Sequence, residues 1–433
     1  MKNKKRSKTI RLFVIFILLG ITIIFCCKRW NAWFGNPIEP AYLNRNTPSR
    51  IQLSLGNDGQ FSRNVNWQCG DTLEISKISL TKEASLDTTS ITVNGNILTT
   101  QGGTTVFYHA KLTGLTEGVY SYNVCTGDKN SEWYSFNINA DDNFRFVYLG
   151  DIQDSIGGKH KNFFTYINES EKDIAFWVLG GDVIERPHDQ YWNEYFKSMD
   201  SISQSMPIIA CPGNHDYSKG IISKLEERFL YNFSYFLDSR SKEHAVFDTQ
   251  YGNTAIIMLD SNVDTWKLFS QQQWFKTALQ KNKDAKWKIV VLHHPIYSVR
   301  GKYRHFIIRR LFEPLIRKYG VDIVLQGHEH CYARKIAKDK NNNATTPIYL
   351  ISNSSPKNYR IKITENYDRY GNGIKFYQTI DVSADTLYLK SFTEHGDLYD
   401  NISIIKTNNN LQVVDLSTEI PEQFNLKNTH YNK

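Results

Sequence analysis

The sequence predicts a β-sandwich domain followed by an α/β domain whose central sheet is buried on both faces. From Arg50 to Ile138 the chain consists of short strand-like segments separated by turn residues such as Asn94-Gly95. After Asp141 the pattern changes to apolar runs that alternate with helix-period stretches, which is typical of a sheet covered by helices. With 433 residues, 40% of them hydrophobic and 22% charged, the chain is long enough for two or three domains with proper cores.

The N-terminal segment is cationic and then apolar. The first 30 residues hold eight basic side chains and no acidic one, and the run Leu12 to Cys27 is uncharged. Residues 1–29 therefore have the pattern of a signal peptide or a membrane anchor, with Cys26 as a candidate lipidation site. Because the positive charge precedes the apolar run, we expect an exported protein in the periplasm, at the cell surface or outside the cell, with the membrane as a partner if the segment is retained.

The rest of the chain is electrically balanced. Of 52 Lys and Arg residues, 44 lie beyond residue 30, and the chain has 44 Asp and Glu residues. The net charge of +8 thus resides in the N-terminal segment, and no basic surface for nucleic acid is predicted.

The organisation expected along the chain is a linker at 30–47, a β-sandwich at 48–140, an α/β domain at 141–406 and a loose, Asn-rich tail at 407–433. Ser270 and Gln273 form a capping-box pattern ahead of one helix, and a second helix is expected from about His305. Cys69 and Cys125 lie in the same predicted domain and could form a disulfide in an oxidising compartment.

Five polar clusters follow apolar runs of the α/β domain. Carboxylates, amides and imidazoles are the side chains that hold pairs of divalent or trivalent metal ions, and in α/β sheets ligands gather where strands end. The clusters are Gly150-Asp151-Ile152-Gln153, Gly181-Asp182, Gly213-Asn214-His215-Asp216, His293-His294-Pro295 and Gly327-His328-Glu329-His330.

In order and spacing this set resembles the calcineurin-like metallophosphoesterase superfamily. The strand domain, with its stretch FYHAKLTGLTEGVYSYNV, resembles the fibronectin type III-like domain that precedes the catalytic domain of purple acid phosphatases. The resemblance implies an αββα-sandwich catalytic domain and dinuclear, metal-dependent hydrolysis of phosphate esters of the acid-phosphatase kind. It also implies a phosphate-ester substrate and allows a homodimer, because members of the family often pair.

Carried over by motif position, the resemblance assigns two metal sites. The first would use Asp151, Asp182 and His330, and the second would share Asp182 and add a further amide and two imidazoles. Gln153 stands where many members have a histidine ligand, and we expect it to be a ligand or to lie beside one. The added ligands of the second site are Asn214, His293 and His328.

Three further residues are expected to serve the reaction. His215 would contact the phosphate and protonate the leaving oxygen, and Asp216 would orient it. His305 is a candidate for a histidine that faces the substrate, with an ordinary helix-start residue as the alternative. His294 is expected to pack beside the ligands.

One position departs from purple acid phosphatases. Glu185 occupies the place of the tyrosine that colours those enzymes, so the metals expected here are Fe, Zn or Mn without that colour. Two other functions remain open at this stage: a phosphodiesterase for nucleotides or lipid headgroups, and a surface protein that binds through its strand domain without catalysis.

Overall fold

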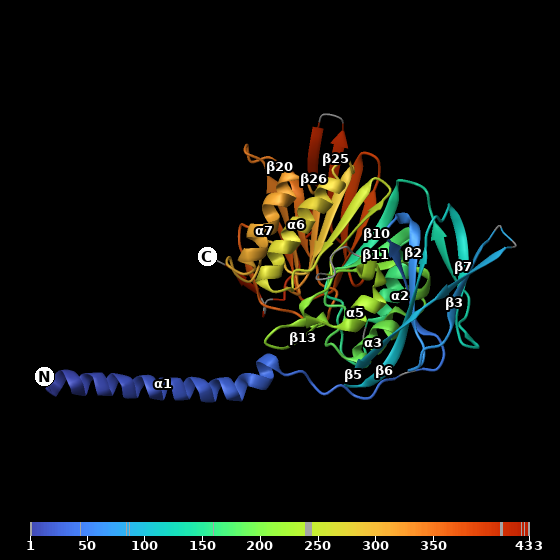
Figure 1. The fold of residues 1–433 in the computed structure, drawn as a ribbon. Helices are drawn as coiled ribbons and strands as arrows, with labels where there is room; N and C mark the ends of the chain where they lie inside the picture. Colours follow the sequence, from blue (N-terminus) through green and yellow to red (C-terminus); the bar gives the residue numbers. More distant parts are fainter. Residues whose placement is uncertain are drawn as a thin grey trace.

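The computed structural model describes residues 2–43, 45–83, 85, 87–158, 160–238, 245–407, 410–425, 427 and 429–431. It confirms an N-terminal β-sandwich followed by an α/β sandwich, with a long helix projecting from the body (Figure 1). That helix, α1, runs from Lys2 to Phe34, and its segment Ile10–Phe34 is long and apolar enough to cross a membrane, a property that signal sequences share.

The N-terminal domain packs two antiparallel sheets over a core that includes Leu53, Trp67 and Tyr122. The first sheet has the order β1-β2-β6-β5. Its strands are β1 (Ser49–Gly56), β2 (Gly59–Gln68), β6 (Gly103–Leu112) and β5 (Gly95–Thr100). The second has the order β4-β3-β7-β8, with β9 also paired to β7. Its strands are β3 (Ser76–Lys82), β4 (Thr88–Val93), β7 (Gly118–Thr126), β8 (Lys129–Asn130) and β9 (Tyr134–Ile138).

Strand β2 has no apolar alternation and escapes prediction from sequence. Its polar side chains are nevertheless buried, because this strand faces the α/β domain. Asn66 donates from Nδ2 to the carbonyl of Asn232 at 2.9 Å, and the guanidinium of Arg63 donates to backbone carbonyls that include Gly59 and Asn137. One hydrogen bond across the domain boundary and several within the β-sandwich thus contribute to the burial of this strand.

The α/β domain consists of two seven-stranded sheets stacked face to face, as the αββα prediction requires. The first has the order β12-β11-β10-β23-β24-β25-β26, with β10, β11 and β12 parallel. Its strands are β10 (Phe144–Leu149), β11 (Ile174–Leu179), β12 (Ile208–Ala210), β23 (Phe376–Val382), β24 (Thr386–Thr393), β25 (Leu398–Thr407) and β26 (Asn410–Asp415).

The second sheet has the order β15-β16-β17-β18-β20-β19-β22, with β16, β17, β18 and β20 parallel. Its strands are β15 (Phe247–Tyr251), β16 (Thr254–Leu259), β17 (Trp287–Leu292), β18 (Ile323–Gln326), β20 (Ala344–Ile351), β19 (Tyr332–Lys338) and β22 (Arg369–Gly371).

Helices cover both outer faces of the stacked sheets. Residues of β16 show the layering, because Ile256 and Met258 join the core between the sheets whereas Ile257 and Leu259 pack toward α6 and α7. The first sheet is covered by α2 (Lys161–Ser170), α3 (Asp189–Met199), α4 (Ile202–Ser205) and α5 (Glu227–Asn232), and the second by α6 (Thr265–Lys281) and α7 (Phe306–Lys318).

Three sequence-based predictions need correction. The segment expected as a linker is held against the body, where Glu39 is buried and ion-paired to Arg228 at 2.5 Å. The described part of the tail is not loose, because β26 pairs with β25 and β27 (Thr429–Tyr431) pairs with β21 (Ile361–Ile363). Ser270 does not cap a helix, since α6 begins at Thr265 and the hydroxyl of Ser270 donates to the carbonyl of Lys267.

A buried ion pair joins the two sheets of the α/β domain. Arg334 on β19 donates to Asp400 on β25 at 2.6 Å, and both side chains are almost fully buried.

We expect Arg334→Met to lower the free energy of unfolding by about 3–5 kcal/mol, because Asp400 would keep a buried charge without its partner. Urea unfolding would measure this change. Arg317→Met, which breaks the half-exposed pair with Glu313, is the control and should cost at most about 1 kcal/mol. Equal losses in the two variants would contradict the prediction.

Candidate metal centre

The predicted ligand motifs meet at one edge of the stacked sheets. Asp151, Asp182 and Asn214 follow β10, β11 and β12 of the first sheet, and His293 and His328 follow β17 and β18 of the second. Parallel strands end at the same edge, and facing sheets bring two such edges together. His293 joins them directly, because its Nδ1 lies 2.9 Å from the carbonyl oxygen of Gly180 at the end of β11.

Asp151, Asp182 and His330 form the first donor cluster. One ligand atom from each lies within 4.8 Å of the others, and all three residues are buried. Among the residues that the structure describes, Oδ2 of Asp151 is buried without a hydrogen-bond partner. Nδ1 of His330 lies 3.0 Å from Oδ1 of Asn353, which orients the ring and turns Nε2 toward the cluster.

Asp182, Asn214, His293 and His328 form the second donor cluster. Nε2 of His293 lies 3.3 Å from Oδ1 of Asp182 and 3.2 Å from Oδ1 of Asn214. Nδ1 of His328 lies 2.7 Å from the same Asn214 oxygen and 3.3 Å from Nε2 of His293. Asp182 therefore takes part in both clusters.

The side chain of Gln153 lies against the first cluster, at the position expected for a ligand or a close neighbour. Its Nε2 donates to Oδ2 of Asp182 at 3.1 Å and lies 3.4 Å from Nε2 of His330. Its Oε1 is buried and has no hydrogen-bond partner in the described part of the chain. The amide thus offers an oxygen donor beside the three residues of that cluster.

Backbone conformation brings these side chains together. Asp151, Asp182, His328 and His330 have φ values of 52°, 51°, 73° and 47°, in the left-handed region that costs a residue other than glycine about 1–3 kcal/mol. Close approach also requires glycine at position 213, where a Cβ atom would lie 2.0 Å from the backbone nitrogen of Asp182. The surrounding fold stabilises a strained arrangement of ligands, as at many functional sites.

The electrostatic environment of the two donor clusters suits the binding of cations. Burial raises the pKa of Asp151 to about 8, opposed by His293 and reinforced by repulsion from Asp182. Burial would also raise the pKa of Asp182, but the imidazole of His293 outweighs it and lowers that pKa below its usual range. The two clusters offer two buried carboxylates, two amide oxygens and three imidazoles, a donor set suited to divalent or trivalent metal ions. The residues present therefore fit a pair of metal ions.

His215 lies beside both clusters but has a different partner from the one expected. Its backbone N–H donates to Oδ1 of Asp182 at 2.7 Å, and its Nδ1 lies 2.7 Å from the carbonyl oxygen of Glu185. The expectation that Asp216 orients the ring is wrong. The carboxylate of Asp216 instead accepts the backbone N–H groups of Gly213, Val183 and Ile184, so it ties together the two loops that carry Asp182 and Asn214.

The rings of His305 and His294 lie beside that of His328 in the second cluster. His305 is the residue before α7 and has a φ of 55°, and its ring centroid lies 5.1 Å from that of His328 and 4.7 Å from that of His294. No described residue forms a hydrogen bond with its buried Nε2. His294 packs as expected, with Nδ1 at 3.1 Å from Oγ of Ser261.

Several neighbours were not predicted. Asn353 follows the apolar run of β20, and the same pattern that identified the other clusters could have identified it. Lys357 donates to Glu185 at 2.5 Å, and the ring centroid of Tyr359 lies 4.4 Å from that of His330. Arg300 lies over the ring of Tyr359 at 4.6 Å. No short motif marks these residues, because folding alone brings their loops to the site.

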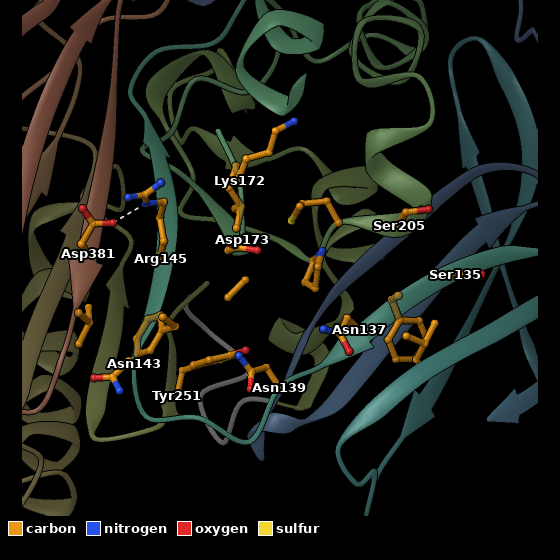
Figure 2. A pocket seen from close by; sticks show the side chains of 18 residues that line it. Ser135, Asn137, Asn139, Asn143, Arg145, Lys172, Asp173, Ser205, Tyr251 and Asp381 are labelled. Atoms are coloured by element: carbon orange, nitrogen blue, oxygen red, sulfur yellow. Dashed lines mark hydrogen bonds and ion pairs between the residues drawn. The ribbon is translucent and has the colours of Figure 1, made fainter. Parts of the chain in front are cut away.

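A cavity of about 670 Å³ lies elsewhere, between the β-sandwich and the start of β10 (Figure 2). Its lining includes Asn143, Arg145 and Asp173, and Arg145 forms an ion pair with Asp381. Since Asp151 follows the opposite end of β10, this cavity is separate from the metal centre.

Comparison with known families agrees with both domains. The profile for the calcineurin-like phosphoesterase family matches residues 144–332, and that for the N-terminal domain of purple acid phosphatases matches residues 48–138. The chain carries a calcineurin-like phosphoesterase domain behind a purple acid phosphatase N-terminal domain. The first profile begins at β10 and ends at Tyr332, so it spans all five predicted ligand motifs of the phosphoesterase domain.

Individual relatives are distant. The chain is 26% identical over 245 residues to probable purple acid phosphatase 20 of Arabidopsis thaliana, covering 54% of this chain and 56% of that protein. It is 23% identical over 303 residues to probable inactive purple acid phosphatase 9 of the same plant, covering 56% and 46%. The match thus spans about half the length of these curated relatives.

A purple acid phosphatase from yellow lupin (Lupinus luteus) seeds has the same fold. The two structures superimpose with a TM-score of 0.70 at 18% identity, covering 84% of this chain and 76% of that one. The order of a sandwich domain followed by a phosphoesterase domain is therefore shared.

The orienting role of Asn353 can be tested by metal affinity. Asn353→Ala removes the acceptor for Nδ1 of His330, and we expect it to weaken metal binding about 10–100-fold. Asn353→Asp keeps an acceptor at this position and should retain more of the affinity. Competition with a chromophoric chelator would measure both variants. Unchanged affinity in Asn353→Ala would show that His330 needs no such support or is not a ligand.

Proposed function

We propose that the protein is a dinuclear metal-dependent phosphomonoesterase of the acid-phosphatase kind that acts outside the cytoplasm. The observation that carries this proposal is the pair of donor clusters that share Asp182 beside His215. The first metal would be held by Asp151, Asp182 and His330, with Gln153 beside it. The second would be held by Asp182, Asn214, His293 and His328.

Two metal ions bound there would neutralise phosphate oxygens and lower the pKa of a water molecule, which is the chemistry that hydrolysis of a phosphate ester needs. Fe, Zn and Mn all suit oxygen and imidazole donors. We propose no tyrosinate ligand at position 185, where this chain has glutamate.

His215 is proposed to protonate the leaving oxygen. The Glu185 carbonyl keeps a proton on Nδ1, so a proton on Nε2 requires the imidazolium form. One oxygen of the Glu185 carboxylate lies 3.7 Å from Nδ1 of the same ring. As the P–O bond breaks, the proton would pass from Nε2 to the departing oxygen. Glu185 would thus position His215 without touching the substrate.

Cationic and imidazole groups outside the ligand set are proposed to hold the substrate. Lys357, in a loop at the centre, pairs with Glu185, and Arg300 stacks over Tyr359 beside His330. A phosphate entering the site would meet these charges beside the ring of His305. These groups orient the ester, while the rest of the substrate would be chosen by the surrounding loops.

Export and attachment belong to the same proposal. The apolar segment of α1 suits either a signal sequence or an anchor, and the match to plant purple acid phosphatases is consistent with secretion or membrane attachment. We propose retention as an anchor, because the segment after α1 is packed against the body through Glu39. A homodimer remains a prediction from the family resemblance alone.

The role of His215 predicts a selective loss of turnover. His215→Ala should lower kcat for a chromogenic phosphomonoester by about 10²–10⁴-fold, because general acid catalysis is removed. The metal content should stay unchanged, since the imidazole is not a proposed ligand. His395→Ala, at an exposed position, is the control. A variant at position 215 with near wild-type kcat would exclude the proposed role.

The reaction class can be tested by metal removal. Chelation should abolish cleavage of a chromogenic phosphomonoester, and re-addition of Fe, Zn or Mn should restore it. A bis-ester chromogenic substrate compared in the same assay tests the phosphodiesterase alternative. Faster cleavage of the diester would overturn the monoesterase proposal, and the absence of bound metal in the purified protein would favour a non-catalytic binding protein.

A further inference from the structure

The end of α1 is hydrogen-bonded to the loop that follows His215. Asn36 and Lys219 form a reciprocal pair: Nδ2 of Asn36 donates to the carbonyl of Lys219 at 2.7 Å, and the N–H of Lys219 donates to Oδ1 of Asn36 at 2.8 Å. Nζ of Lys219 also donates to the carbonyl of Ala32 in the last turn of α1 at 3.3 Å. Figure 1 shows β13 (Tyr217–Ser218) beside the point where α1 leaves the body.

The segment that follows α1 is also held against the body, through Glu39. The carboxylate of Glu39 accepts the N–H of Asp189 at 2.8 Å and that of Gly102 at 3.1 Å, and it pairs with Arg228. It thereby contacts both the α/β domain and the β-sandwich. The helix and the loop after His215 therefore have a defined relative position.

An exposed apolar patch lies around this contact. Ile221 and Ile222, in the turn between β13 and β14 (Lys224–Leu225), are 79% and 64% exposed, and Ile38 beside Asn36 is 88% exposed. The lysines at 219 and 224 are exposed next to them. We call Ile38, Ile221 and Ile222 with these two lysines the junction patch. Apolar side chains flanked by lysines suit the interface of a bilayer.

Helix geometry places this patch at the membrane surface. If Cys27, the last residue of the apolar run, marks the outer edge of the hydrocarbon core, Ala32 lies five residues beyond that edge, which is about 7.5 Å along a helix. That distance matches the depth of one headgroup layer, about 5–8 Å. Lys219 would then lie at the outer limit of the headgroups. His215 precedes Lys219 by four residues, so it lies within about 14 Å of this level.

We propose that the junction patch rests on the bilayer that holds α1, and that the substrate is a membrane lipid with a terminal phosphate monoester. This inference rests on the proposed phosphomonoesterase function and on retention of the anchor. Water adds to phosphorus, the bond from phosphorus to the lipid oxygen breaks, and His215 donates a proton to that oxygen. The products are the lipid alcohol and inorganic phosphate.

A lipid substrate makes use of this geometry, whereas a soluble ester gains nothing from a site held at a membrane. The occupant of the patch is therefore taken to be the bilayer itself. A second copy of the chain or a soluble partner would cover the same isoleucines without any need for α1, and the experiment separates these cases.

The first test uses the full chain in phosphatidylcholine nanodiscs that contain phosphatidic acid, with a soluble chromogenic phosphomonoester assayed in parallel. Ile221→Ser/Ile222→Ser should lower release of phosphate from phosphatidic acid at least tenfold and leave cleavage of the soluble ester unchanged. Ile75→Ser/Ile97→Ser is the matched control, because these isoleucines of the β-sandwich are 82% and 51% exposed. It should change neither rate.

A second variant tests the tether. A flexible Gly-Ser insert of about 20 residues between Gly35 and Asn36 spans about 25 Å and would release the body from the surface. It should lower cleavage of phosphatidic acid tenfold or more and spare the soluble ester. Equal lipid cleavage with and without the insert would overturn the proposal. So would an intact soluble activity with no cleavage of phosphatidic acid by the unmodified chain.

A readout independent of catalysis keeps the two proposals distinguishable. An environment-sensitive fluorophore on Ile222→Cys, in a Cys26→Ser/Cys27→Ser background, should shift its emission to the blue in nanodiscs, whereas the same label on Ile75→Cys should not. This result with no activity on any ester would refute the phosphatase and retain the membrane contact. Identical emission at the two positions would refute the membrane contact, and self-association through the patch would give the blue shift without nanodiscs.

Discussion

Asp151 and Asp182 lie buried beside each other where parallel strands of two facing sheets end, and the surrounding structure depends on this arrangement of like charges. Each carboxylate is costly to bury without compensation. The fold supplies His293 and backbone N–H groups from the loops of His215 and His328. It provides no hydrogen-bond donor from the described residues to Oδ2 of Asp151. A pair of bound cations would balance the remaining negative charge of the two carboxylates. The same buried carboxylates therefore create the need for cations and hold them for the proposed chemistry.

The loops around these carboxylates are held by contacts that carry no catalytic chemistry. Asp216 accepts three backbone N–H groups and so joins the loop after β11 to the loop after β12. Asn353 orients His330 from a neighbouring strand. Strained backbone at four ligand positions is stable only because such contacts overdetermine it. The rigid frame provides the precision that two shared metal sites require.

Glu185 adds a negative charge beside the candidate metal centre. A glutamate replaces the tyrosine expected from purple acid phosphatases, and it interacts with His215 on one side and Lys357 on the other. This links the group proposed to donate a proton to a cation proposed to meet the phosphate.

The sequence by itself determined both domain types and predicted the residues that the fold gathers at the candidate metal centre, because strand-end motifs are local and short spacings of Asp, Asn and His can be recognised without the fold. Contacts between distant segments were decided only by the tertiary structure. The polar strand β2 is buried because Asn66 and Arg63 find partners after folding. Glu39 is fixed by Arg228, 189 residues away. The ring of His215 is held by Glu185, although Asp216 is its neighbour in sequence. Hydrogen-bond partners depend on which backbone groups folding leaves unpaired, and no local sequence pattern predicts which groups these are.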